Sequence, residues 1–295
     1  MNLNLIAQVV VYGLIPGSLY ALLGTSWNLI YHTTRTFDFA HATVFVTAAY
    51  AFLLLTVNAG LPFVAAGILG VVAAVLLGTG MEVLVYRRFR RIGATLFVIF
   101  IAALGMSILG ESLIHILFTA AHRRFEGFTI VSLHLGQVTF TNLHVLEVVV
   151  SAIAITAVYL YMTRTRAGKT IRAVACNPDM AQVVGISKDA TFVLAFALGS
   201  GLMGLSAVLW TMEKGGVLPF MGMEPLFKSF IVAIIGGIGS IPGAVAGGLI
   251  LGVAENLGLL VLPAEMKSIV AFIVLIIFLI VRPTGLFPSE VRKLI

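Results

Sequence analysis

The sequence has few charged residues. Asp, Glu, Lys and Arg fill 10% of its 295 positions, whereas a soluble domain usually needs about 25% to cover its surface. Apolar residues fill 60%, and the mean hydropathy is +1.11. These values exclude an ordinary water-soluble domain, and the long apolar runs indicate that the surface faces a lipid bilayer.

Cysteine is almost absent as well. The single Cys176 excludes an intramolecular disulfide and a metal site built from cysteines. The six histidines show no metal-type pairing at helical spacing, so we expect neither a metal nor another cofactor. No set of serine, histidine and acidic residues stands out as catalytic, and we do not expect an enzyme.

Motifs for nucleotide binding also fail. Arg166-Ala-Gly-Lys-Thr170 resembles the end of a phosphate-binding loop, but Thr163 stands where the pattern needs its first glycine. An active transporter with this sequence would therefore use an ion gradient or ATP hydrolysis on another chain. The formal charge of +6 does not indicate nucleic acid, because the basic residues lie in short segments between apolar runs, where they reflect membrane orientation.

Eight apolar stretches are candidates for membrane-spanning helices, each of which needs about 20 apolar residues. They are residues 6–31, 39–57, 62–85, 94–118, 145–163, 190–212, 226–261 and 267–281. We therefore predict an all-α, polytopic integral membrane protein of about eight transmembrane helices. Residues 1–295 would form a single transmembrane domain, with a polar loop at 119–144 and a longer charged loop at 164–189.

The basic residues predict the orientation. Placing residues 31–38, 86–93, 164–189 and the tail from Arg282 in the cytoplasm collects 13 of the 18 Lys and Arg residues there. The N-terminus is then outside and the C-terminus inside. The number of crossings fits if 226–261 enters the membrane and returns, with its turn at 239–243. Its first arm, 226–238, would be only about 20 Å long as a helix, so a re-entrant or broken segment is the alternative.

Two glycine- and proline-rich segments interrupt the helical pattern. Residues 13–17 predict a kinked or broken first span, because Pro16 lacks a backbone donor. Residues 236–243 contain more helix breakers. Such backbone at membrane depth must be buried in protein or line a cavity. Gly237 and Gly239 are therefore candidates for a transport pathway, and an ordinary tight turn is the alternative.

Residues 177–185 predict a short helix in the charged loop. Asn177 is a good N-cap, Pro178 suits the first helical position, and Gly185 is a typical stop. A helix over 178–184 is too short to be stable alone in water. It must be buried by the protein's own helix ends, by lipid headgroups or by a docked partner.

Polar residues within or beside the spans are costly and often functional. Glu255, followed by Asn256, is a candidate for a pathway or gating role, and a satisfied interhelical hydrogen bond is the alternative. Asp38 and His41 are three residues apart and could share a helix face. They are candidates for the same role or for a structural pair at the membrane edge.

Four blocks of sequence follow one another along the chain. They are Gly17-Ser-Leu-Tyr20-Ala-Leu with Asn28-Leu-Ile-Tyr31 and Phe39-Ala-His41; Gly168 to Ile186 with Arg172-Ala-Val-Ala175; Phe230 to Glu255 with Gly236-Gly237-Ile-Gly239-Ser-Ile-Pro242-Gly243; and Arg282-Pro-Thr-Gly285-Leu-Phe287. Together they resemble the permeases of branched-chain amino acid ABC importers, of the leucine/isoleucine/valine type. One block departs from the family, which usually has Asn-Phe-Ala-His-Gly where this chain has Asp38-Phe-Ala-His41-Ala42.

The resemblance implies a subunit of the inner membrane that imports branched-chain amino acids. It implies pairing with a second, related permease subunit, two cytoplasmic ATPase subunits that hydrolyse the ATP, and an extracytoplasmic substrate-binding protein. The residues it assigns to coupling with the ATPase are Arg172, Asn177, Met180, Ala181, Val183, Val184 and Gly185. Related permeases carry urea or short amides, and an ion-coupled secondary transporter is a further alternative.

Overall fold

The computed structural model describes residues 3–118, 123–124, 131–135, 138–263 and 266–287. The helices are α1 (Leu3–Thr34), α2 (His41–Val57), α3 (Phe63–Met81), the π-helix η1 (Glu82–Tyr86), α4 (Arg87–Arg91), α5 (Leu96–Phe118), α6 (Asn142–Arg164), α7 (Arg166–Cys176), α8 (Pro178–Val183), α9 (Lys188–Lys214), α10 (Met223–Gly236), α11 (Ile241–Gly258) and α12 (Lys267–Val281). The chain divides into two compact units: unit 1 contains residues 1–28, 127–155 and 227–295, and unit 2 contains 29–126 and 156–226.

The helices have the length and composition of membrane spans. In the part of the chain that the structure describes, six are long and apolar enough to cross a bilayer: Gln8–Thr34, Phe63–Arg91, Leu96–Phe118, Asn142–Arg164, Lys188–Lys214 and Ile241–Gly258. Two shorter apolar helices are His41–Val57 and Lys267–Val281. The chain is thus a mostly helical, polytopic membrane protein, as predicted.

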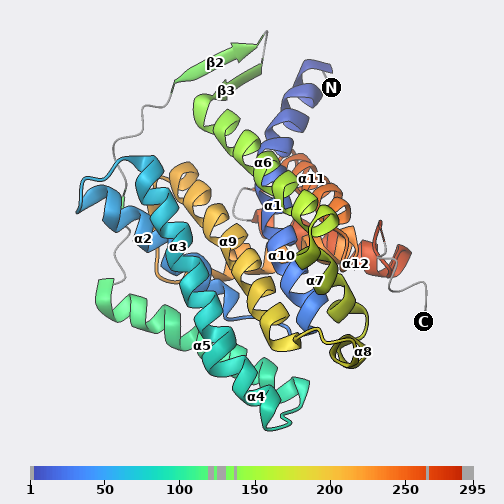
Figure 1. The fold of residues 1–295 in the computed structure, drawn as a ribbon. Helices are drawn as coiled ribbons and strands as arrows, with labels where there is room; N and C mark the ends of the chain where they lie inside the picture. The colour runs from blue at the N-terminus through green and yellow to red at the C-terminus, as the bar shows by residue number, and fades with distance from the viewer. Residues whose placement is uncertain (1–2, 119–122, 125–130, 136–137, 264–265, 288–295) are drawn as a thin grey trace. The chain divides into compact units, whose positions relative to one another are not determined.

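The two short sheets were not predicted. In unit 1, β2 (Ser132–Leu135) and β3 (Val138–Thr141) form an antiparallel hairpin just before α6 (Figure 1). In unit 2, β1 (Arg123–Arg124) pairs antiparallel with β4 (Gly216–Val217). Both hairpin strands and β1 fall within the predicted polar loop 119–144, parts of which lie outside the described residues.

The first span, predicted to be kinked or broken, is not broken. Helix α1 continues through Pro16 as one helix of 32 residues (Figure 1). The two glycines beside the proline pack against α11, because a Cβ on Gly13 would lie 2.6 Å from the Cα of Val253 and one on Gly17 would lie 3.0 Å from the Cα of Leu249. The spacing of these glycines lets two helix backbones approach closely, and it does not mark a break.

Gly252 on α11 supplies a direct test of this packing. A Cβ there would lie 2.5 Å from the Cα of Gly17, so Gly252→Ala is expected to destabilise the protein by about 1–3 kcal/mol through overpacking. Gly105 on α5 is the matched control, since a Cβ there meets nothing within 4 Å. Gly105→Ala should leave stability unchanged or raise it by up to about 1 kcal/mol. Thermal unfolding in detergent measures both, and equal melting temperatures for the two variants would contradict the packing.

The predicted region 226–261 forms two helices joined by a tight turn. Helix α10 ends at Gly236, and α11 begins at Ile241, with the Ser240 side chain accepting a hydrogen bond from the Gly243 N–H as its N-cap. At 14 residues α10 is about 21 Å long, as short as the predicted first arm.

Unit 2 is built around α2, α3 and α9, which pack side by side (Figure 1). The buried face of α3 carries only small residues in the described helix. They recur at every fourth position: Ala66, Gly70, Ala74 and Gly78. The next positions in this series, Glu82 and Tyr86, are also buried and lie in η1. A π-helical turn contains more residues than an α-helical one, and here it keeps this four-residue spacing on the buried face.

The basic segment 86–93, which the sequence places between two spans, is mostly helical. The helical backbone continues to Arg91, and three of the arginines form ion pairs with carboxylates. Arg90 pairs with Glu82, while Arg87 and Arg91 each lie 3.1 Å from the Oδ2 atom of Asp189 at the start of α9. Long arginine side chains can extend a span in this way, because they bury their stems and keep their charged ends paired.

Candidate functional site

A network of buried charges lies inside unit 1. The Tyr20 hydroxyl on α1 donates a hydrogen bond of 2.7 Å to the Glu255 Oε2 atom on α11. Lys228 Nζ on α10 lies 2.6 Å from the Tyr20 oxygen and 3.3 Å from the same Glu255 oxygen. Lys267 Nζ at the start of α12 lies 3.5 Å from it. One carboxylate oxygen therefore connects four helices.

The network is almost inaccessible to solvent. Glu255, Tyr20 and Lys228 are buried, and only Lys267 is partly exposed. Lys228 Nζ also lies 4.4 Å from the centroid of the Tyr20 ring, a cation–π contact. Taking such charges out of water is costly, and attraction offsets the cost only when the geometry is good. The second carboxylate oxygen, Glu255 Oε1, has no hydrogen-bond partner among the described residues, so it is an acceptor still available within the network.

Sequence reasoning selected Glu255 but missed its partners. Lys228 interrupts the apolar run of α10, which was a usable signal, whereas nothing in the sequence links Tyr20 to a carboxylate 235 positions away. Asn256 was also predicted, but its amide donates to the Gly252 carbonyl of its own helix at 3.0 Å. Asn256 is thus outside the network.

The turn between α10 and α11 holds the predicted Gly237 and Gly239. Both have left-handed backbone, with φ of 101° and 91°, which favours glycine. The Asn28 carboxamide on α1 fastens the turn: its oxygen accepts the Gly239 N–H at 2.5 Å, and its nitrogen donates to the Ser240 carbonyl at 3.1 Å. Asn28 was noted in the sequence only as part of a family block.

Asp38 and His41, which were predicted to share a helix face, lie close together in unit 2, but Asp38 precedes α2 and only His41 belongs to that helix. His41 Nδ1 lies 3.5 Å from Asp38 Oδ2, and both residues are buried. The Tyr86 hydroxyl donates a 2.5 Å hydrogen bond to the other Asp38 oxygen. Asp38 lies in the loop between α1 and α2. Burial of its carboxyl raises the pKa of Asp38 to about 6, against the lowering effect of this hydrogen bond.

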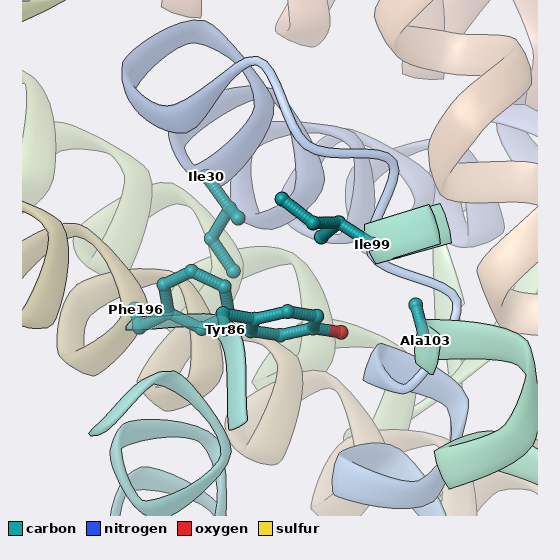
Figure 2. Close-up of a cluster of buried hydrophobic side chains, with 5 residues drawn as sticks. All are labelled: Ile30, Tyr86, Ile99, Ala103 and Phe196. Carbon is teal, nitrogen blue, oxygen red and sulfur yellow. The ribbon is translucent and has the colours of Figure 1, made fainter. Parts of the chain in front are cut away.

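Tyr86 belongs to a hydrophobic cluster with Ile30, Ile99, Ala103 and Phe196. Figure 2 shows its ring against Phe196 and its hydroxyl at the far side of the ring from Phe196; the two ring centroids are 5.3 Å apart. The cluster holds the hydroxyl in place for Asp38. This arrangement connects the loop between α1 and α2 to the helix that carries Arg87 and Arg90. Tyr86 was not predicted as a site residue.

Helix α8 is the predicted short helix of the 164–189 loop. Asn177 caps it, accepting the N–H groups of Asp179 and Met180 at 3.1 and 3.0 Å, and Gly185 ends it with a φ of 85°. The helix covers Pro178–Val183, one residue shorter than predicted.

The two faces of α8 differ. Ala181 is buried against Val174 of α7 and Phe192 of α9. Met180, Val183 and Val184 are 65%, 82% and 73% exposed. These three apolar side chains form a small exposed apolar surface at the helix, whereas the predicted Ala181 anchors the helix from the buried side. The predicted Arg172 is exposed on α7, and its guanidinium donates to the Met162 carbonyl.

The described residues contain no group of three His, Cys, Asp or Glu side chains that could hold a metal ion. The site residues fall into two sets, one in each compact unit. Unit 1 contains the Glu255 network and the turn at Gly237 and Gly239. Unit 2 contains the Asp38 pair and α8.

Comparison with known proteins identifies similar chains. The model of a family described as branched-chain amino acid transport system, permease component, matches residues 9–279. The chain is 33% identical to the high-affinity branched-chain amino acid transport system permease protein BraD of Pseudomonas aeruginosa, over 97% of each chain. It is 32% identical to the corresponding protein LivH of Escherichia coli, over 95% of each. No solved structure matches.

Proposed function

The chain belongs to the family of branched-chain amino acid transport permease components, and on this premise we propose that it is the membrane-spanning subunit of an ATP-driven importer of branched-chain amino acids. The similarity to permeases named for this transport, which covers 97% of the chain, carries the proposal. The chain itself would carry out no covalent chemistry, and ATP hydrolysis would take place on separate ATPase subunits.

The proposed assembly has four kinds of subunit. This chain pairs with a second, related permease chain, two ABC ATPases bind at the cytoplasmic face, and a binding protein delivers substrate from outside. The exposed apolar face of α8 supports the position of the ATPase contact, because Met180, Val183 and Val184 would be buried by a docked protein. Residues Arg172, Asn177 and Gly185 would support the contact by fixing α7 and α8, and Ala181 would do so from the buried side.

The proposed orientation places the N-terminus outside and the C-terminus inside the inner membrane. The 164–189 loop with α8 is then cytoplasmic, and the 119–144 loop faces the binding protein. Residues 1–295 act as one permease domain. Glu255 with its network, Asn256, the turn at Gly237 and Gly239, and the Asp38 and His41 pair are proposed to line or gate the pathway as it alternates between outward- and inward-open states.

Uptake of radiolabelled leucine into proteoliposomes tests this function. The liposomes would contain this chain co-purified with its ATPases and partner permease, and the binding protein would be added outside. We expect uptake that needs ATP in the compartment facing the ATPases, that resists an uncoupler, and that excess isoleucine and valine inhibit. Uptake that needs no ATP and is abolished by the uncoupler would instead identify a secondary transporter. Competition by urea or acetamide, but not by isoleucine, would reassign the substrate.

A further inference from the structure

A basic cavity lies next to α8 in unit 2, where α4 meets the start of α9. Its volume is about 420 Å³, and the residues lining it include Arg90, Arg91, Lys188, Asp189 and Phe192. At about 30 Å³ for each water molecule, this is room for roughly a dozen waters, so a phosphodiester group fits. Gln182 of α8 also lines the cavity.

The cavity carries an excess of positive charge. Three basic side chains, Arg90, Arg91 and Lys188, line it together with one carboxylate, that of Asp189. Two further charged residues pair with these lining residues: Glu82 with Arg90, and Arg87 with Asp189. Asp189 is shared between Arg87 and Arg91. Within the described part of the chain Lys188 forms no ion pair, and the Arg91 side chain is 68% exposed. Two positive charges are therefore left for an external anion.

The position of the cavity selects the kind of anion. The apolar span Phe63–Arg91 ends here and the span Lys188–Lys214 begins here, so the cavity lies at the depth of lipid headgroups. The chain after Arg91 then exposes Ile92, and α5 starts with exposed Leu96 and Phe97. A lipid could place its headgroup among the basic side chains and its acyl chains along this apolar surface. Basic pockets at the ends of membrane helices are suited to anionic headgroups.

We propose that this cavity binds the phosphodiester headgroup of an anionic phospholipid, with Arg91 and Lys188 as its principal contacts. Cation–π contact with the Phe192 ring, 4.6 Å from the Arg90 guanidinium carbon, and the pairing of Arg90 with Glu82 keep Arg90 in place at the cavity wall. The bound lipid would contact Gln182 and so would fix the position of α8. The inference depends on the chain being a membrane protein and not on the transported substrate.

Native mass spectrometry of the purified, delipidated full chain tests the proposal. Equal amounts of palmitoyl-oleoyl-phosphatidylglycerol and palmitoyl-oleoyl-phosphatidylcholine would be titrated in, and the lipid adducts counted. We expect the wild type to bind one phosphatidylglycerol in preference to phosphatidylcholine. Arg91→Gln with Lys188→Gln should weaken that binding about 25-fold, since each basic residue near an anionic lipid contributes about 1 kcal/mol. The fold should persist, because Arg87 still pairs with Asp189.

The matched control is Arg166→Gln with Lys169→Gln, which removes the same charge from exposed positions of α7 outside the cavity. It should bind phosphatidylglycerol as the wild type does. Equal loss in both double variants, or no preference in the wild type, would overturn the proposal. So would displacement of the lipid by millimolar inorganic phosphate, which would identify a site for free anions. If the Arg91 and Lys188 variant keeps its lipid in this assay but loses the ATPases in a separate co-purification, the cavity belongs to a protein partner and the proposal fails.

Discussion

Replacing Met180 and Val183 by aspartate is expected to abolish ATP-driven uptake while the chain stays folded. Both side chains are more than half exposed, so the two substitutions should hardly change the stability of the isolated chain. Ala181 still anchors the helix from the buried side. In the proposed complex the two carboxylates would be buried without partners. An uncompensated buried charge costs about 3–5 kcal/mol, which corresponds to more than about 100-fold in affinity for the ATPase.

The measurement is co-purification of the ATPase with this chain, together with leucine uptake in proteoliposomes. Met180→Leu with Val183→Ile is the matched control, because it keeps the apolar surface and should keep both ATPase binding and transport. The far-ultraviolet circular dichroism of the aspartate variant should match that of the wild type. A folded aspartate variant that binds the ATPase and transports at the normal rate would show that α8 is not the coupling surface.

Removing the carboxylate of Glu255 is expected to be the most destabilising single change in the buried network. Glu255→Leu leaves Lys228 and Lys267 without the carboxylate that both contact, and breaking a buried ion pair in this way costs about 3–5 kcal/mol. Lys228→Met should cost less, because Glu255 keeps the Tyr20 hydroxyl and Lys267. The double variant should recover part of the loss, since a well-packed apolar pair often replaces a buried ion pair at little cost.

Thermal unfolding of the purified chain in one detergent compares these variants. Asn256→Ala is the neighbouring control, because the Asn256 amide donates to the Gly252 carbonyl of its own helix, and the loss of this bond should cost about 1 kcal/mol or less. Leucine uptake by Lys228→Met then separates the roles of the network. A variant that is stable but transports poorly would support a gating role, and one that is stable and fully active would leave the network a structural one. If Glu255→Leu has the same melting temperature as the wild type, the network does not hold the helices together.

Local signals in the sequence predicted most of the helices and the whole of α8. Asn177, Pro178 and Gly185 act within a few residues of one another, so their effect on the backbone does not depend on the rest of the fold. The apolar runs predicted the spans for the same reason. The helix α12 begins at Lys267 and ends at Val281, as predicted.

The failures of prediction involve contacts between distant segments. Pro16 suggests a break when α1 is considered alone. The four-residue spacing of Gly13 and Gly17 is typical of close helix packing, but only the folded chain identifies α11 as the partner helix. Glu255 was predicted as a site residue because it is a charge within a span. Its interactions are with Tyr20 and Lys228, and no sequence periodicity connects these residues to it. The hydrogen bond from Tyr86 to Asp38 likewise needs the packed cluster around the ring.

Leu286 and Phe287 complete the hydrogen bonding at the C-terminal end of α10, which lies about 50 residues earlier in the sequence. The N–H groups of Leu286 and Phe287 donate to the carbonyls of Ile235 and Gly236, which are among the last carbonyls of α10 and have no partner within that helix. Gly285, with a φ of 78°, lies against Gly237 where a side chain would clash. During synthesis α10 therefore enters the membrane with an unfinished C-terminal end, and it is completed only after residue 287 has left the ribosome. A released chain that ends at residue 281 should leave the C-terminal end of α10 open to proteolysis, whereas a released chain that ends at residue 287 should protect it.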